Sequence, residues 1–197
     1  MIKVQRRHRI LGPLGLALML LSALILALTA ALLLPAVVLA EKPTSFSASG
    51  QVYVAGAPVP APAGLSGRLR FLEEPVLGSI TDGGGWSALT GASFSTVHDS
   101  NVSLDPNTGA VQGTMHGTFT LEKTGSIFTG TFEGTISGNL ATGPVVDTGR
   151  WSGARGTGIF QGAKGRGTWT ATLYPVYDTN GNLVTLAGPL TFAGTYQ

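Results

Sequence analysis

Few residues in this chain could do chemistry, and the clearest pair is His116 and Glu133. They flank the segment Lys-Thr-Gly-Ser at 123–126, and a hairpin with Thr124-Gly125 at its tip would place them face to face. A histidine beside a carboxylate can act as an oriented general base. The outer face of a barrel strand presents the same kind of pair to solvent. We favour this solvent-exposed cross-strand pair.

A second histidine, His98, precedes Asp99 at the end of an expected strand, and the two could contribute to a metal site. Two histidines on strands not known to be neighbours are weak support for metal binding, so we expect this dipeptide at the surface. The chain has no cysteine, which excludes disulfides, thiolate chemistry and cysteine-based zinc sites. The sequence implies no metal and no cofactor.

Two glycine-rich segments, 156–158 and 162–165, have some likeness to a nucleotide-binding loop. A phosphate loop needs its glycine-rich turn to open a helix, whose N-terminus binds the anion. Here Gly167-Thr168-Trp169 follows instead, and this composition is typical of a strand. A turn between strands is therefore the better interpretation. The hydrolase and metalloprotease motifs G-x-S-x-G and H-E-x-x-H are also absent from the chain.

Aromatic side chains are better candidates for binding. Those at the mouth of a barrel often line a ligand cavity, where one or two charges fix the orientation of the ligand. The alternative for each is packing in the core or at the rim. The candidate ligand-binding residues are aromatics on an expected glycine-rich loop or near strand ends, with two neighbouring arginines: Trp86, Trp151, Arg150, Arg155, Tyr174 and Tyr177.

An enzyme working inside a barrel would need an ionisable side chain that points inward among the Phe, Leu and Trp side chains. The sequence assigns no catalytic residue. The charged residues to examine for that role are Glu122, Glu133, Asp147, Arg150 and Arg155.

The chain after Ala40 reads as all-β, because no stretch spaces its apolar residues as a helix does. The segment 55–64 reads as a stiff extended loop, and turns are expected at 105–109 and at Asn180-Gly181. The expected strands cover residues 47–54, 68–73, 76–81, 93–98, 110–122, 150–154, 157–160, 167–174 and 183–196, together with a strand that follows Ser126. This number and spacing predict a barrel, with a sandwich as the alternative.

The hairpin around 123–126 has a well-specified register. With Thr124-Gly125 at the tip, residues whose numbers sum to 249 face each other, and one face pairs large residues with glycine or apolar partners, as in Phe119 with Gly130. Such pairing supports glycine-containing strands. The other face is mainly threonine, so a slip of one residue would mix the two faces.

The run GTGIFQGAKGRGTWTATL at 156–173 resembles the late-strand segment of the allene-oxide-cyclase and dirigent barrel superfamily, a calycin-like barrel. Gly156, Gly158, Phe160, Gly162 and the Ala-x-Gly that follows match the glycine spacing of that turn. The resemblance covers roughly 93–197 and implies an eight-stranded barrel with an apolar-lined cavity open at one end. Members of that family include cyclases, isomerases and proteins that steer radical coupling. None of the family's catalytic residues is carried over to this chain.

The first forty residues form a distinct segment. A basic start is followed by a stretch without charge from Ile10 to Ala40, which ends Val-Leu-Ala before Glu41. This pattern predicts a signal peptide cleaved after Ala40, with an uncleaved N-terminal membrane anchor as the alternative. Both would export the rest, because positive charge stays inside. We expect an extracytoplasmic protein, either secreted or held at the outer side of the cytoplasmic membrane by the leader alone.

Charge excludes one class of partner. Four of the 12 basic residues lie in the leader, so residues 41–197 carry eight basic and ten acidic residues, a net charge of −2. A domain without basic surplus lacks the electrostatic attraction that nucleic acid requires.

The fold expected is a single antiparallel β-barrel of about eight strands over 41–197, preceded by an apolar leader helix. The sequence favours a non-catalytic module that binds a small apolar ligand. Two alternatives remain open, a cofactor-independent cyclase or isomerase acting in the barrel cavity and a structural or adhesive envelope module. The sequence does not predict the oligomeric state.

Overall fold

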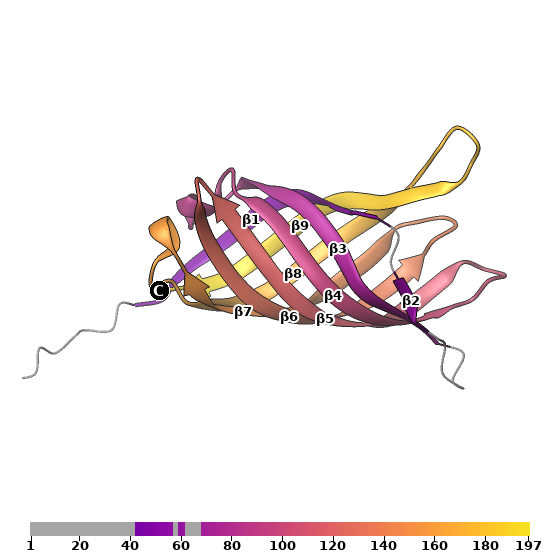
Figure 1. Ribbon diagram of the computed structural model, residues 1–197, viewed down its shortest axis with the longest axis horizontal. Helices are drawn as coiled ribbons and strands as arrows, with labels where there is room; N and C mark the ends of the chain where they lie inside the picture. Colours follow the sequence, from indigo (N-terminus) through magenta and orange to yellow (C-terminus); the bar gives the residue numbers. More distant parts are fainter. Residues whose placement is uncertain (1–41, 57–58, 62–67) are drawn as a thin grey trace, which may run out of the picture. The chain divides into compact units, whose positions relative to one another are not determined.

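The chain folds into a closed antiparallel β-barrel, as a computed structural model shows for residues 42–56, 59–61 and 68–197 (Figure 1). The expected leader, with its apolar helix, lies outside the described residues. Within the described ranges, no helix is long and apolar enough to cross a membrane.

Eight long strands make the barrel, and each pairs antiparallel with its neighbours in sequence. The ring closes because the first strand pairs with both the last strand and the third. The short β2 (Val59–Ala61) adds to one end of the third strand outside this ring. The eight strands are β1 (Thr44–Val54), β3 (Leu69–Asp82), β4 (Ser93–Leu104), β5 (Ala110–Lys123), β6 (Ser126–Asn139), β7 (Val145–Gly156), β8 (Gly165–Tyr177) and β9 (Leu183–Tyr196). The prediction of an all-β barrel is confirmed, and the alternative of a sandwich is wrong.

Side chains alternate between the interior and solvent along each strand, as a barrel requires. On β5, Met115 and Phe119 are buried, whereas His116 and Thr118 are exposed. The predicted hairpin register is confirmed at every pair of β5 and β6. The φ angles of Thr124 and Gly125 are 49° and 76°, which suits a tight two-residue hairpin turn.

Three expected elements differ from the structure. Within the segment 55–64, expected as an extended loop, Val59–Ala61 forms the short strand β2. Residues 68–73 and 76–81 are parts of one strand, β3, which is interrupted by a bulge between Phe71 and Glu74 rather than by a turn. The segment 157–160 is not a strand, because Gly158–Phe160 forms a 3-10 helix, η2, between β7 and β8. Gly158 has a φ of 56°, a backbone conformation that ends strand geometry.

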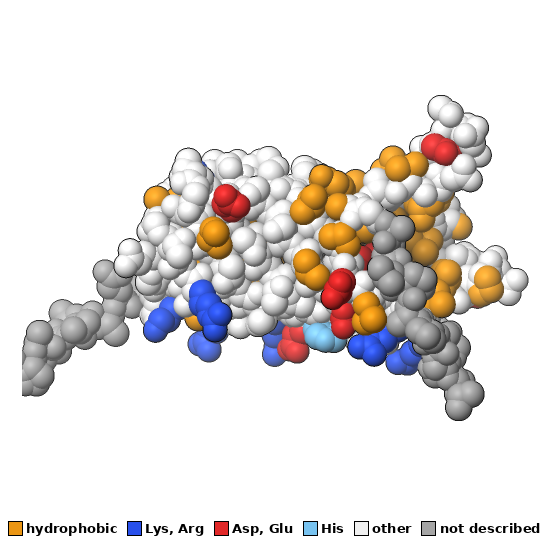
Figure 2. Space-filling view, in the orientation of Figure 1, with side chains coloured by type: hydrophobic (Ala, Val, Ile, Leu, Met, Phe, Trp, Pro, Cys, Tyr) orange, Lys and Arg blue, Asp and Glu red, His pale blue; other side chains and the backbone are white. Residues whose placement is uncertain are grey.

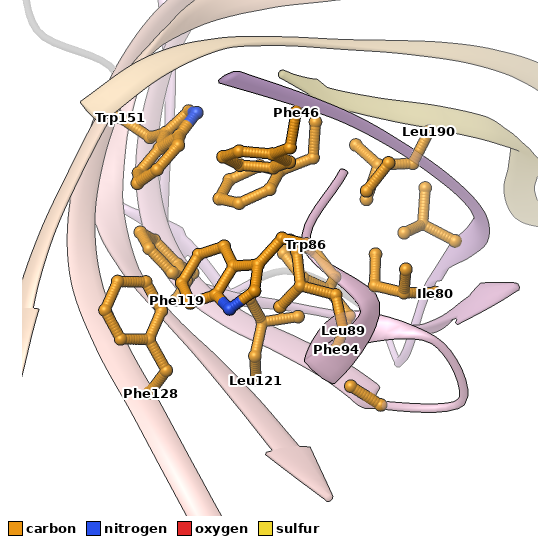
Figure 3. Packing of buried hydrophobic residues seen from close by; sticks show 14 of the residues in the cluster. Phe46, Ile80, Trp86, Leu89, Phe94, Phe119, Leu121, Phe128, Trp151 and Leu190 are labelled. Carbon is orange, nitrogen blue, oxygen red and sulfur yellow. The ribbon is translucent and has the colours of Figure 1, made fainter. Parts of the chain in front are cut away.

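One end of the barrel, here called the packed end, carries the connections 83–92, 124–125 and 157–164. The 3-10 helix η1 (Ser87–Leu89) and the preceding Trp86 fold inward there. Figure 3 shows the Trp86 indole between Phe46 and Phe128, whose ring centroids lie 5.3 and 5.2 Å from it. On its other side, Tyr196 stacks against the indole at 4.4 Å. The loop that carries Trp86 therefore fills the barrel rather than extending from it.

Glycines leave room inside the barrel for these rings. A Cβ at Gly130 would lie 2.6 Å from Cε1 of Phe119, and one at Gly134 would lie 2.8 Å from Cζ2 of Trp169. Both distances are shorter than van der Waals contact allows, so the large-to-small pairing seen in the sequence is a packing requirement.

The opposite end, here called the cavity end, carries the connections 105–109, 140–144 and 178–182. Apolar side chains are exposed around it, most of them on the projecting β8–β9 hairpin, and Figure 2 shows them gathered at this end of the molecule. These residues are Leu104, Tyr174, Val176, Tyr177, Leu183 and Val184.

Candidate functional site

A cavity of about 370 Å³ occupies the cavity end of the barrel. Leu183 and Val184 line it and are also 48% and 63% exposed, so the cavity reaches the surface beside the β8–β9 hairpin. Its lining is mostly aliphatic: Val54, Gly56, Phe71, Val76, Val102, Val111, Met115, Ile136, Leu140, Val145, Leu173, Leu183, Val184, Thr185 and Leu186, with Glu74, His98, Ser100 and Asp147 as the remaining residues.

Four polar side chains lie together in this apolar setting, and they come from three strands. The Nε2 atom of His98 lies 3.2 Å from Oε2 of Glu74, a contact that is an ion pair when the imidazole is protonated. The Ser100 hydroxyl donates to the same oxygen at 3.4 Å. Asp147 on β7 faces the same cavity from across the barrel. We call Glu74, His98, Ser100 and Asp147 the polar cluster.

A bulge in β3 lies directly before Glu74. Glu73 has a φ of 53°, and the in-and-out alternation changes there, so that Phe71 before the bulge and Glu74 after it both line the cavity, with Glu74 opposite His98. Asp99 secures the bulge from outside: its carboxylate accepts a hydrogen bond from the Glu73 amide at 3.1 Å and lies 3.6 Å from Arg70. Bulges that redirect a side chain are frequent beside functional sites.

Asp147 is the least compensated member of the cluster. It is 7% exposed, and no described residue donates a hydrogen bond to its Oδ1 atom. Burial raises the pKa of Asp147 to about 7, the nearby Glu74 adds to the rise, and His98 opposes it. The reason is that a low-dielectric interior penalises the charged form, and a second carboxylate does the same. Asp147 therefore changes its protonation state near neutral pH.

A smaller chamber of about 50 Å³ lies between the polar cluster and the packed end. His98, Asp147 and Met115 line both spaces. Two further polar atoms near this chamber, Oγ1 of Thr96 and Nε1 of Trp169, have no hydrogen-bond partner among the described residues. This chamber has room for one small group beyond the cluster.

The polar cluster can donate, accept and exchange protons with a molecule that enters the cavity. Two carboxylates and an imidazole beside an apolar space are the groups that general acid–base chemistry or hydrogen-bonded ligand recognition uses. In the part of the chain that the structure describes, no three His, Asp or Glu residues are arranged to hold a metal ion.

The six candidate ligand-binding residues are not brought together. Trp86 and Trp151 are buried in the aromatic core, and the Trp151 ring donates to the Ala193 carbonyl at 3.0 Å. Arg150 and Arg155 face solvent on the outer surface of β7. Tyr174 and Tyr177 are half exposed at the cavity end, near the mouth but outside the lining; the Tyr177 hydroxyl donates to the Leu140 carbonyl at 2.8 Å.

Among the charged residues to examine, Asp147 is the one that points inward; Glu122, Glu133, Arg150 and Arg155 are exposed. The pair of His116 with Glu133 lies on the outer face, as expected.

The surface position expected for His98 is wrong, because this side chain is 5% exposed. Residues 94, 96, 98, 100 and 102 of β4 are all buried, and this alternation could have placed His98 inside. The same alternation extends to Ser100, whereas Glu74 carried no comparable signal on its own.

Comparison of the chain with protein-family models, with curated proteins and with solved structures finds no match. The fold and site define a class without reference to relatives: a closed eight-stranded antiparallel barrel, packed at one end and hollow at the other, with a buried ionisable cluster inside. The resemblance to the allene-oxide-cyclase and dirigent superfamily stays a prediction based on glycine spacing.

Proposed function

We propose that this domain binds a small, mainly apolar molecule in the cavity of about 370 Å³ and holds its polar group at the polar cluster. The observation that carries the proposal is the combination of an aliphatic lining with a few buried polar groups at its inner end. This combination is typical of small-molecule sites, whose volumes begin at roughly 300 Å³. We also propose that the domain works outside the cytoplasmic membrane, on the support of the basic and apolar leader pattern.

A structural or adhesive module would have a filled barrel and an exposed apolar or aromatic surface patch, and exposed apolar side chains do lie at the cavity end. The filled barrel is the requirement that separates this alternative from ligand binding. The packed end meets that requirement, whereas the cavity end does not. Isolated buried polar atoms such as Asp147 Oδ1 and His98 Nδ1 lower stability unless they meet a partner. A ligand that supplies hydrogen bonds gives these atoms a role, and this favours binding over a purely structural function.

Calorimetric titration with 1-octanol tests the proposal, because this ligand has an apolar chain and one polar group. We expect saturable binding to the purified chain. Ile136→Trp should weaken binding at least tenfold, because Ile136 lines the cavity and the larger ring would occupy it. Ser137→Trp is the matched control, since the adjacent residue is exposed on the outer face. Absence of binding by octanol and by eight-carbon ligands with other headgroups, or an equal loss in both variants, would refute the proposal.

A second candidate function is cofactor-independent proton transfer, as in an isomerase or cyclase. It is favoured by the position of Asp147, which is buried, lines the cavity and has no partner at Oδ1; burial also raises its pKa to about 7, near the range that a general base requires. The test is exchange of the α-hydrogens of 2-octanone in D₂O, followed by NMR. Catalysed exchange that disappears in Asp147→Asn would support this function, and exchange no faster than in buffer would remove it.

A further inference from the structure

The ionisable groups that face the cavity are unequal in sign. Glu74 and Asp147 are potentially anionic, His98 is the one potentially cationic side chain, and no Lys or Arg lines the space in the described ranges. The faces contributed by β5, β6, β8 and β9 bring only uncharged side chains, among them Met115 and Ile136. The inner end of the cavity is therefore rich in acceptors and poor in cationic donors.

Within the cluster, Glu74 and the Nε2 atom of His98 already satisfy each other. Their side chains meet at 3.2 Å, and Ser100 adds a hydrogen bond to the same glutamate oxygen. Asp147 has no such partner at Oδ1, although it is more than nine-tenths buried and borders both the cavity and the inner chamber. Two atoms of the cluster remain without a partner: His98 Nδ1, and Asp147 Oδ1, which requires a hydrogen-bond donor.

The charge of that donor follows from the surroundings of Asp147. An anionic headgroup would be buried beside two carboxylates, which is strongly unfavourable. A neutral hydroxyl can donate one hydrogen bond. An ammonium donates and neutralises the carboxylate at once, and such charge-assisted hydrogen bonds are about twice as strong as neutral ones.

We propose that the ligand is an amine with an apolar body, whose ammonium group binds Asp147 while its hydrocarbon part lies along the aliphatic walls towards Leu183 and Val184. This inference rests on the proposed binding function and specifies its ligand class. The volume accommodates roughly a dozen water-sized groups, so alkylamines or arylalkylamines of about that many heavy atoms fit.

The affinity for an amine should depend on pH. Burial sets the pKa of Asp147 at about 7, and an ammonium binds its ionised form. Alkylamine binding should therefore strengthen about thirtyfold between pH 5.5 and pH 8, a range in which the amine itself stays charged. Glu74 and His98 are the other ionisable side chains that line the cavity with Asp147 in the described ranges.

Calorimetric titration of the purified chain with octylamine, 1-octanol and octanoate separates the possibilities, because the three differ only in their headgroup. We expect octylamine to bind roughly ten to a hundred times more tightly than octanol at pH 8. Asp147→Asn should reduce octylamine affinity to that of octanol and remove its pH dependence. Glu133→Gln, which deletes a carboxylate from the outer face, should change neither.

Equal affinity for octylamine and octanol would overturn the amine assignment and leave apolar binding intact. Preference for octanoate would also overturn it and would point to His98 as the headgroup partner. Failure of all three ligands to bind would overturn both this inference and the proposed function. The pH dependence in the unmodified chain provides an independent test, since flat octylamine binding from pH 5.5 to pH 8 would refute the role of Asp147.

Discussion

The packed end and the cavity end belong to the same eight strands, yet their interiors are built from different residues. At the packed end, Trp86, Phe119, Phe128 and Phe160 interlock with ring centroids near 5 to 6 Å apart. At the cavity end, the buried residues are smaller, and Val102, Val111 and Val145 form a separate minor cluster. Aliphatic side chains of that size cannot span the lumen, so a cavity of about 370 Å³ remains.

This difference shows that dense packing and open space have separate locations in the barrel. The aromatic core is dense and fully apolar, and each ring contacts several others. The cavity end leaves apolar surface without protein contacts, and it buries polar atoms without partners. Both features reduce folding free energy, so the packed end must compensate for them. Substitutions should therefore have unequal effects at the two ends.

The largest contrast is expected between a leucine enclosed by the aromatic core and a leucine at the border between that core and the cavity. Leu121 is fully buried in the aromatic core, whereas Leu173 is buried but borders the cavity. Leu121→Ala should lower the free energy of unfolding by about 4 kcal/mol, because the dense core leaves an unfilled hole. Leu173→Ala should cost roughly 2 to 3 kcal/mol, because its cavity side has fewer contacts to lose.

Urea unfolding of both variants measures these values, provided that the m-values stay equal. Thr172→Ala, a truncation on the outer side of β8 next to Leu173, controls for effects on strand propensity. Equal losses for the two leucines would mean that the cavity end is as densely packed as the aromatic core, contrary to the comparison.

The sequence predicted the packed end far better than the site. Large side chains opposite glycines specified the register of β5 and β6, because a slip of one residue would have placed Phe119 in solvent. The site depends instead on Glu74, which follows the bulge at Glu73 and lies at the point where the alternation of β3 changes. A bulge shifts the alternation by one residue, and no pattern within a single strand shows where that shift occurs.

Long-range strand pairing explains why the sequence did not predict the other contacts of the site. Glu74 and His98 meet because β3 and β4 pair in one register, and Asp147 joins them only when the barrel closes. Asp147 was recognised as a residue to examine, but its neighbours could not be identified from the sequence. Local signals determine a hairpin, whereas a site built from three strands requires the closed topology.

A buried carboxylate at the cavity end should make stability depend on pH. The pKa of Asp147 is about 7 in the folded chain and 3.8 as the ordinary reference value. The folded state thus holds its proton where the unfolded state has lost it, so stability is greatest below about pH 4 and falls until about pH 7. The loss from this group is about 4 kcal/mol. Asp147→Asn should abolish this loss.

The measurement is the urea midpoint at pH 4.5, 6 and 8 for the unmodified chain, Asp147→Asn and Glu133→Gln. Turn hydrogen bonds lower the pKa of Asp105 and Asp178, so their stabilisation is lost only as pH falls below about 4, outside this window. Identical pH profiles for the unmodified chain and Asp147→Asn would show that this carboxyl is not buried as described.

The smallest difference in stability is expected between two alanine-to-valine variants. They test where the densely packed core ends and the cavity begins. Ala48 is fully buried at the packed end, whereas Ala171 borders the chamber of about 50 Å³ beneath the polar cluster. Ala48→Val should cost about 1 to 3 kcal/mol, because the surrounding rings cannot move aside. Ala171→Val should change stability by less than about 1 kcal/mol, because its added methyl groups can enter the chamber.

Urea midpoints measure the stability of the two variants. Both variants gain the same β-branched side chain, so the effect of strand propensity cancels between them. A larger loss of stability at Ala171 than at Ala48 would contradict this comparison. It would mean that the densely packed core extends past Ala171 up to the polar cluster.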